Sequence, residues 1–256
     1  MNLYYELLGR PVFTAEDVAR YYNSVNSTRS TLKRLLNQNL IVKIRNNLYT
    51  CISGETGAPV ASRYQIACKI TDTAYLSHHT AIEYYGLSGQ VYYEVYVASE
   101  TRFRDFEFDG YVYKYISTKS QSGVEEVKYS GGVRVTDMER TLVDSIKDMD
   151  HLSGIEEIVS FIRSIRKLDE MKLCQYLSEY ERQFLFQKTG YLLETYYTNA
   201  GITDVFYEFC RRNIGKSKRY LTKDILQGGY NSRWKLVVPD AKAFLKNGEN
   251  DEYDRI

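Results

Sequence analysis

The chain has 256 residues, 43% of them hydrophobic and 26% charged, with a net charge of +1. A chain of this length holds one large or two ordinary domains. Its near-zero charge excludes a general attraction to polyanions, so any nucleic-acid binding must come from local basic patches.

The N-terminus lacks the basic start and long apolar stretch of a signal peptide. No window approaches the roughly 18 continuous apolar residues of a membrane span. The four cysteines are scattered along the chain, which argues against a zinc cluster and is typical of reduced thiols in a cytosol. We therefore expect a cytoplasmic protein that has no membrane partner.

Residues 13–51 carry the pattern of two helices followed by two strands. Thr14 precedes the first helix and Asp17 follows three residues later, which is the layout of a capping box. The second helix carries a stripe of three leucines, and we expect Asn26 as its N-cap. Two strand-like runs then flank a turn at Arg45-Asn46, where asparagine tolerates a positive φ. Helix, turn, helix, hairpin is the order of a winged helix-turn-helix.

The charges of this stretch favour DNA binding, because residues 23–51 contain five basic side chains and no acidic one. We expect small polar groups opposite the leucines (Ser27, Ser30, Thr31) to approach base edges in a major groove, and Arg34 to grip a guanine in bidentate fashion. The predicted DNA-binding residues are Ser27, Thr28, Ser30, Thr31, Lys33, Arg34, Lys43, Arg45, Asn46 and Asn47, with the lysines and Arg45 directed towards phosphates. The alternative is a helix–hairpin module with a solvated basic face, since winged helices also bind proteins.

Turn-forming residues cluster at 53–59 and predict a linker. The expected domains are a winged helix-turn-helix DNA-binding domain over 1–52 and a C-terminal domain over 60–256. Within the latter we expect a sheet at about 74–136, helices at about 137–210 and a basic segment at 211–223. The predicted fold class is α+β, with an antiparallel sheet and a helical C-terminal part.

The sheet region opens with a predicted helix over 60–71 and a second one over 77–85. Period-two alternation and a strong hairpin turn at Asp109-Gly110 then predict strands. The expected strands are 74–76, 91–97, 103–108, 111–116, 124–129 and 132–135, in a mostly antiparallel sheet of about four or five strands.

His78 and His79 invite a metal-site interpretation. Adjacent helical residues point in different directions, and His151 is the one further histidine in the sequence. No nearby spacing completes a ligand set. We therefore expect a structural role for the pair and no metal.

Asp137, Glu139, Arg140 and Asp144 gather at the start of the next predicted helix. Carboxylates so placed can bind Mg²⁺ or carry acid–base chemistry. The alternative is an N-cap followed by salt bridges, since Arg140 and Asp144 are four residues apart. No glycine-rich phosphate cradle accompanies the cluster, so we favour the structural interpretation and predict no catalytic residue and no cofactor.

Helices are predicted over 155–165, 171–180 and 184–199. Six basic residues and no acid lie between 211 and 223. Such a run is usually a solvated face, but it can also form a second DNA contact, for which the candidates are Arg211, Arg212, Lys216, Lys218 and Arg219. A turn at 228–231, a final strand at 234–239 and a frayed acidic end at 248–256 are expected to complete the chain.

Several of these segments together resemble the AbiEi family, the antitoxins and transcriptional repressors of type IV (AbiE) bacterial toxin–antitoxin systems. The likeness rests on the N-terminal winged helix ending in KIRNNLY, on AYLSHHTAIEYYGLSGQ, on VTDMERTLVD, and on the terminal GKSKRYL and GGYNSRWKLVVP. These segments span nearly the full length. The wing turn departs from the family's glycine (as in RGLY), with Asn46-Asn47 in its place, and asparagine tolerates that geometry.

The resemblance implies a protein of a phage abortive-infection system that binds inverted repeats in its own promoter and represses a two-gene operon. Its C-terminal domain would counteract a nucleotidyltransferase-like toxin encoded by the second gene. In the family, positively charged residues of that domain contribute to DNA binding. The basic run 211–223 is the segment of this chain that could make the same contribution. We expect a monomer or weak dimer that binds cooperatively, since no heptad stripe predicts a coiled-coil dimer.

Two other classes of function remain as alternatives. One is a nuclease of the PD-(D/E)xK kind, because Pro239-Asp240 is followed by Lys242; the second acid and its spacing are missing, so we predict no enzyme. The other is a protein-binding antitoxin or adaptor in which the winged helix is an interaction module. The acid-free second helix counts against that alternative.

Overall fold

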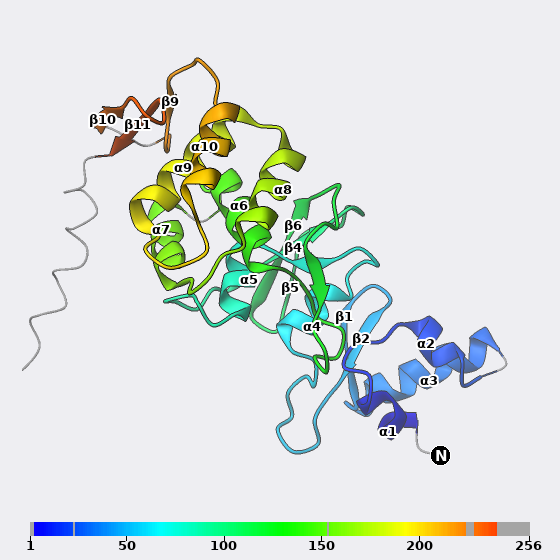
Figure 1. Cartoon of the computed structure of the whole chain (residues 1–256). Coiled ribbons are helices and arrows are strands. Elements are labelled where there is room, and N and C mark those ends of the chain that lie inside the picture. Colours follow the sequence, from blue (N-terminus) through cyan, green and yellow to red (C-terminus); the bar gives the residue numbers. More distant parts are fainter. Residues whose placement is uncertain (1–2, 23, 153, 224–227, 240–256) are drawn as a thin grey trace, which may run out of the picture. The chain divides into compact units, whose positions relative to one another are not determined.

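The computed structural model describes residues 3–22, 24–152, 154–223 and 228–239 (Figure 1). The chain divides into two compact units. The first unit comprises Met1–Tyr84 and Val91–Thr136, and the second comprises Tyr85–Gln90 and Asp137–Ile256. The predicted α+β class is confirmed, with antiparallel and mixed sheets and several helices.

The predicted boundary at 53–59 lies inside the first unit rather than between the two units. This segment is a tight loop: the Ser53 amide donates to the Ala58 carbonyl over 2.9 Å, and Ile52 pairs with Pro59. Because the loop closes on itself, the chain on both sides of it stays in one compact body.

The first unit begins with three helices and a hairpin: α1 (Leu3–Leu8), α2 (Ala15–Ala19), α3 (Val25–Asn37), β1 (Ile41–Arg45) and β2 (Leu48–Cys51). The predicted capping box of α2 is confirmed, since the Thr14 hydroxyl accepts from the Asp17 amide and the Asp17 carboxylate accepts from the Thr14 amide. The N-cap of α3 is Ser24 and not the predicted Asn26. The Ser24 hydroxyl reaches the Ser27 amide at 3.1 Å, which moves the start of the helix towards the N-terminus.

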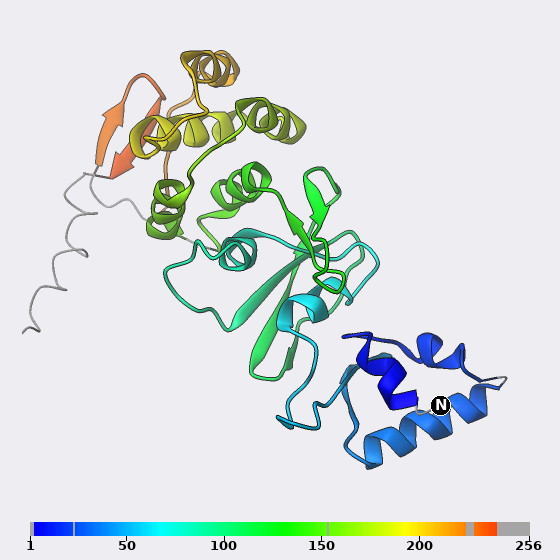
Figure 2. The same cartoon turned by 60° about the horizontal axis from the view of Figure 1, so that its bottom comes forward.

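One apolar core joins these elements, and α1 and α2 both lie along α3 (Figure 2). Its buried members are Leu7, Phe13, Val18, Leu32, Leu35, Ile41 and Cys51. Phe13 also pairs with Tyr49 through two backbone hydrogen bonds of 3.0 and 2.9 Å. The hairpin β1–β2 therefore has a short third partner strand just before α2.

The rest of the first unit is built around a six-stranded sheet in the order β5-β6-β4-β3-β8-β7. The strands are β3 (Tyr75–Leu76), β4 (Glu94–Ser99), β5 (Phe106–Phe108), β6 (Tyr111–Ser117), β7 (Val124–Glu126) and β8 (Arg134–Thr136). Helix α4 (Arg63–Cys68) precedes β3, and α5 (His78–Tyr84) lies between β3 and β4 in sequence. Helix α4 is shorter than the predicted 60–71, because a Ser62–Gln65 capping box sets its start.

The prediction of a mostly antiparallel sheet of four or five strands is confirmed only in part, since the sheet has six strands and three of its five neighbouring pairs are antiparallel. The pairs β4–β6 and β3–β8 are parallel. The hairpin turn at Asp109-Gly110 does join β5 and β6, and both residues have positive φ. However, β5 lies outside β6 at the sheet edge, so β6 runs parallel to β4. A hairpin turn determines only the antiparallel pairing of the two strands that it joins. The period-two pattern of hydrophobic residues does not show which distant strand pairs with them.

The second unit is mainly helical: α6 (Met138–Asp148), α7 (Gly154–Ser164), α8 (Glu170–Tyr180), α9 (Gln183–Tyr196) and α10 (Asp204–Asn213). The helices predicted over 155–165, 171–180 and 184–199 are confirmed as α7, α8 and α9. A three-stranded sheet follows in the order β10-β11-β9, made of β9 (Arg219–Tyr220), β10 (Gly228–Asn231) and β11 (Leu236–Pro239). The predicted turn at 228–231 is therefore a strand; pairing with β11 outweighs the low strand propensity of its two glycines.

Asp240 and Lys242 of the nuclease-like motif, and the acidic stretch 248–256, lie outside the described residues. Within the described ranges, no helix is long and apolar enough to cross a membrane.

Candidate nucleic-acid interface

Helix α3 presents a polar, basic face on the side opposite its buried leucines. Ser27, Ser30 and Arg34 follow one another at spacings of three and four, so they share a face, and all three are exposed. Arg29 and Lys33 lie beside them and are also exposed. The helix contains no acidic residue, so every charge on this face is positive.

Thr28 and Thr31 do not belong to that face, contrary to prediction. Both are buried, and the Thr28 hydroxyl donates to the Ser24 carbonyl over 3.2 Å. Thr28 lies one turn before Leu32, and Thr31 one turn before Leu35, so a helix that buries its leucines also buries these threonines. Their role is to pack α3 into the core.

The hairpin β1–β2 carries the remaining predicted residues, of which Lys43 and Asn46 are exposed. Arg45 is instead half-buried against the rest of the first unit. Its guanidinium lies 5.0 Å from the ring centre of Phe106 and 5.7 Å from that of Phe103. This cation–π packing directs the Arg45 charge towards the protein rather than towards a phosphate.

Asn47 holds the hairpin against the start of α2. Its Oδ1 accepts from the Ala15 amide at 3.0 Å, and its Nδ2 donates to Glu16 Oε2 at 2.7 Å. The second bond is the main reason why the pKa of Glu16 is lowered. Asn47 itself has a φ of 59°, a left-handed conformation that asparagine tolerates. Both amide atoms are thus engaged in positioning the hairpin relative to the helices.

Asn47→Ala is therefore expected to destabilise the first unit by about 2–3 kcal/mol. Holding alanine in the left-handed conformation accounts for about 1–2 kcal/mol of this loss. Loss of the hydrogen bond that caps the start of α2 accounts for about 1 kcal/mol. Asn47→Gly keeps the backbone conformation and should lose only the hydrogen-bond part. Urea unfolding of both variants measures the difference, and equal losses would contradict the role of the positive φ.

In the basic run 211–223, some side chains contact other residues of the protein and others are exposed to solvent. The Arg211 guanidinium lies 6.0 Å from the Trp234 ring centre, and Arg212 contacts Glu208 at 3.4 Å on the surface of α10. Lys216, Lys218 and Arg219 are exposed. Three of the five residues predicted as a second DNA contact therefore face solvent without an ion pair among the described residues.

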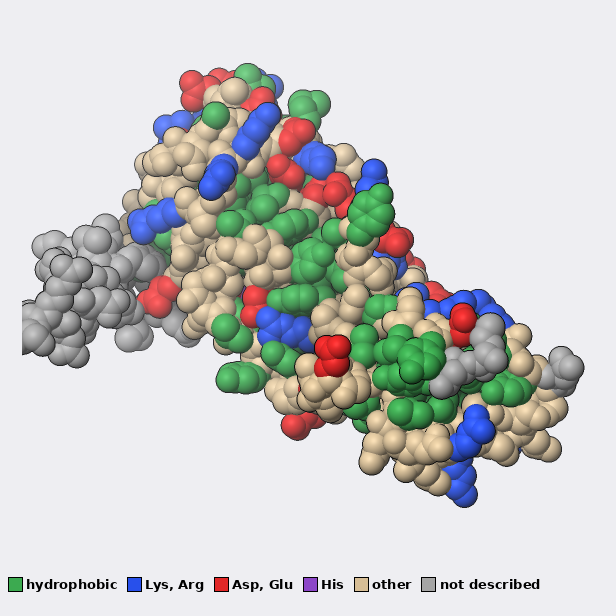
Figure 3. All heavy atoms as spheres, turned by 90° about the horizontal axis from the view of Figure 1, so that it is seen from below, with side chains coloured by type: hydrophobic (Ala, Val, Ile, Leu, Met, Phe, Trp, Pro, Cys, Tyr) green, Lys and Arg blue, Asp and Glu red, His purple; other side chains and the backbone are tan. Residues whose placement is uncertain are grey.

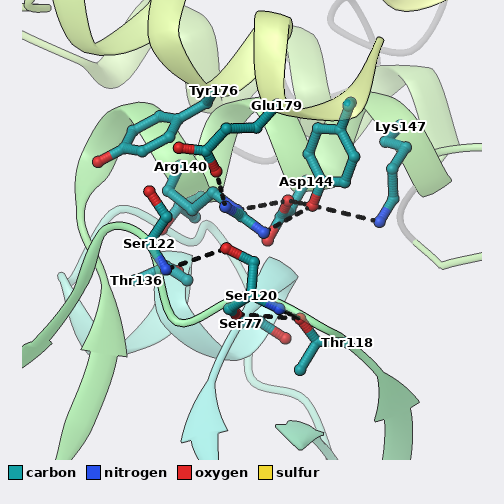
Figure 4. A network of polar contacts seen from close by, with 12 residues as sticks. Ser77, Thr118, Ser120, Ser122, Thr136, Arg140, Asp144, Lys147, Tyr176 and Glu179 are labelled. Carbon is teal, nitrogen blue, oxygen red and sulfur yellow. Dashed lines mark hydrogen bonds and ion pairs between the residues drawn. The ribbon is translucent and has the colours of Figure 1, made fainter. Parts of the chain in front are cut away.

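Arg140 stands at the centre of the acidic cluster predicted in the second unit (Figure 4). It is 1% exposed, and its Nε donates to Asp144 Oδ1 over 2.9 Å, in the predicted i,i+4 pair. Its Nη1 lies 3.4 Å from a Glu179 oxygen, and its Nη2 donates to the Tyr180 hydroxyl over 2.8 Å. Arg140 thereby joins α6 to α8.

The other carboxylates of the cluster also form hydrogen bonds and ion pairs within the second unit. Asp137 caps α6 by accepting from the Arg140 amide, and its second oxygen accepts from the Tyr176 hydroxyl at 2.7 Å and Lys172 Nζ at 2.9 Å. Burial, followed by Asp137, raises the pKa of Tyr176. Glu139 accepts from the Asp169 amide at 2.7 Å. Among the described residues, no group of three or more histidine, cysteine or acidic side chains could hold a metal ion, and the geometry is that of the structural interpretation.

His78 and His79 are both buried within the first unit. The His79 ring lies 4.2 Å from the ring of Tyr92 and 4.1 Å from that of Tyr96, and its Nε2 contacts the Glu94 carbonyl at 2.9 Å. Burial lowers the pKa of His79. The ring is therefore a packing element between α5 and β4.

These features define a two-unit α+β protein whose first unit exposes a basic helix and hairpin. No protein-family model matches the chain, and no curated protein sequence matches it. Among solved structures, the chain is similar to the crystal structure of the Rv2827c protein from Mycobacterium tuberculosis, with a TM-score of 0.67 and 13% sequence identity. The match covers 96% of this chain and 92% of that one. At this identity the likeness establishes the fold alone.

Proposed function

We propose that the chain is a DNA-binding antitoxin and autorepressor of the AbiEi kind, with residues 1–52 as its winged helix-turn-helix. The observation that carries the proposal is the acid-free exposed face of α3, placed next to a two-stranded hairpin. The backbone pairing of Phe13 with Tyr49 supports it, because a short strand against a hairpin is part of winged-helix architecture. The sequence resemblance, which extends over nearly the whole chain, supplies the operon context.

In this proposal α3 lies in the major groove of an operator. Arg34 reads a guanine through two hydrogen bonds, and Ser27 and Ser30 approach neighbouring base edges. Lys33 and Lys43 contact phosphates, which fixes register without reading sequence. Binding to inverted repeats in the promoter, as a monomer or weak dimer with cooperativity, represses the operon. The second unit counteracts a nucleotidyltransferase-like toxin in the cytoplasm.

Arg34→Ala is expected to weaken binding to the DNA upstream of the gene by about 1–3 kcal/mol and to relax base choice at one position. Lys43→Ala should weaken all duplexes alike and lower the salt slope by about one. Fluorescence anisotropy of the purified protein, with a scrambled duplex as the reference and a salt titration for each, measures both effects.

Arg34→Lys is the matched control, since lysine keeps the charge and loses the bidentate fork. It should keep the salt slope of the unmodified protein and lose selectivity. Unchanged operator affinity in Arg34→Ala would show that α3 does not read bases through this face.

A protein-binding antitoxin or adaptor is the second candidate, and one observation favours it. Tyr5 on α1 is 69% exposed, and hydrophobic side chains gather over the N-terminal helices on the face shown in Figure 3. Equal, weak binding to the operator and to the scrambled duplex would favour this function. Co-purification with the toxin would then identify the partner.

A further inference from the structure

The three-stranded sheet of the second unit carries two tyrosines in one row. Tyr220 on β9 and Tyr230 on β10 both pair in register with Val237 on the central strand β11. Residues paired in register share a face of the sheet. The two rings therefore stand on the same face, on either side of Val237 (the sheet is seen in Figure 2).

This face is open to solvent at the rings. Tyr220 is 56% exposed and Tyr230 is 52% exposed, whereas Val237 between them is 7% exposed. On the strand of Tyr230, the residue two positions earlier is Gly228, which has no side chain to cover the ring. Leu236, one position from Val237, is fully buried and faces the core of the unit. The two tyrosines are thus about half open to solvent, whereas the valine between them is covered.

One lysine lies close to both rings. Lys218 Nζ lies 6.0 Å from the ring centre of Tyr220 and 5.5 Å from that of Tyr230, so one ammonium sits near both. Lys216, two residues before Lys218, is exposed as well; Arg219 is also exposed, but it pairs with Leu236 and so belongs to the opposite face of the sheet. Within the part of the chain that the structure describes, none of these three cations forms an ion pair with a carboxylate. Exposed aromatic rings beside unneutralised cations are typical of a surface that stacks bases and attracts phosphates.

We propose that this face binds single-stranded nucleic acid, with bases stacked on Tyr220 and Tyr230 and the backbone along Lys216 and Lys218. The spacing favours a single strand over a duplex. Strands two positions apart in a sheet are separated by about 10 Å, whereas stacked bases of a duplex follow one another at about 3.4 Å. Splayed bases can reach two such rings, and bases inside a duplex present no face to them.

This surface belongs to the second unit and the proposed DNA-reading helix to the first, so the proposal does not rest on the proposed function. Its ligand is defined by base faces and phosphates and not by a sequence, because every base has a π-face. RNA and single-stranded DNA are both expected to bind.

The test uses the full-length protein and a fluorescein-labelled 12-nucleotide oligouridylate in an anisotropy titration. Tyr220→Ala and Tyr230→Ala should each weaken binding about tenfold, and the double variant about a hundredfold, since stacking on one aromatic ring accounts for effects of this size. The matched Tyr→Phe double variant keeps both π-faces and should bind within about twofold of the unmodified protein. Lys218→Met should lower the salt slope by about 0.7.

A second readout covers the case in which an alanine variant unfolds. Crosslinking of 4-thiouridine in the same oligonucleotide, followed by peptide mapping on the unmodified protein, should identify Tyr220 or Tyr230. Oligothymidylate should give similar affinities to oligouridylate. The alanine variants should keep their affinity for the duplex upstream of the gene, and Arg34→Ala should keep its affinity for oligouridylate. The two proposed binding sites are thereby tested independently of each other.

Three results would overturn the proposal. The first is oligouridylate binding that is insensitive to the alanine double variant. The second is a phenylalanine double variant as weak as the alanine one. The third is a 12-base-pair duplex that binds as tightly as the single strand and depends equally on both tyrosines, which would make the face a duplex-backbone contact.

Discussion

Replacing Arg140 with alanine is expected to destabilise the second unit by about 3–5 kcal/mol, because it leaves a buried carboxylate without its partner. The side chains of Arg140 and Asp144 are 2% and 4% exposed, so solvent does not screen their 2.9 Å ion pair. The same guanidinium also contacts Glu179 and Tyr180 of the neighbouring helix. One substitution therefore removes several of the polar contacts between α6 and α8, while those of Asp137 with Tyr176 and Lys172 remain.

Urea unfolding followed by circular dichroism measures this loss. The double variant Arg140→Met/Asp144→Leu is the matched control, since apolar side chains of similar volume leave no buried charge and should recover much of the stability. Operator binding by Arg140→Ala at low temperature should be unchanged, because the proposed DNA-reading helix belongs to the first unit. A loss below about 1 kcal/mol in the single variant would contradict the buried ion pair.

Trp234→Ala is expected to cost the second unit about 3–5 kcal/mol, the range for truncating a fully buried aromatic residue. Trp234 is the one tryptophan of the chain and is fully buried. Its Nε1 donates to Glu194 Oε2 over 2.6 Å, and its carbonyl accepts from Gln187 Nε2 over 3.2 Å. Trp234 thereby connects the three-stranded sheet to α9. Its replacement should also abolish oligouridylate binding by the face that carries Tyr220 and Tyr230.

Gly190→Ala tests the same contact from the other side. A Cβ at position 190 would lie 2.2 Å from two atoms of the Trp234 ring, so the ring must move. The expected cost is about 1–3 kcal/mol, as for other overpacked cores. Because the chain has a single tryptophan, its fluorescence reports this displacement directly as a red shift of the emission maximum. An unshifted spectrum with unchanged stability would show that the ring does not pack on Gly190.

Local signals in the sequence predicted the elements whose causes are local. The Thr14 capping box, the Asp137 N-cap and the i,i+4 pair of Arg140 with Asp144 depend on residues within one helical turn, and each is present. The hairpin turn at Asp109-Gly110 is also present, because its glycine and aspartate adopt the positive φ that such a turn needs.

Tertiary packing decided which candidate site residues remain exposed. Thr28 and Thr31 have the small polar side chains of a DNA-reading face, yet the rotation of α3 in its core buries them. Arg45 has the charge of a phosphate contact, but two phenylalanines distant in sequence hold it. The helical period predicts that a face exists, whereas the width of the buried stripe depends on what packs against it.

Period, capping and charge are properties of neighbouring residues, and they were enough to predict the α+β class, the order of most elements and the position of both basic segments. The parallel pairs of the large sheet and the row of Tyr220, Val237 and Tyr230 become visible only in the folded chain. Both arise from strands that meet across long separations in the chain. No local pattern encodes which distant strand becomes a neighbour, because that choice depends on how the whole core is buried.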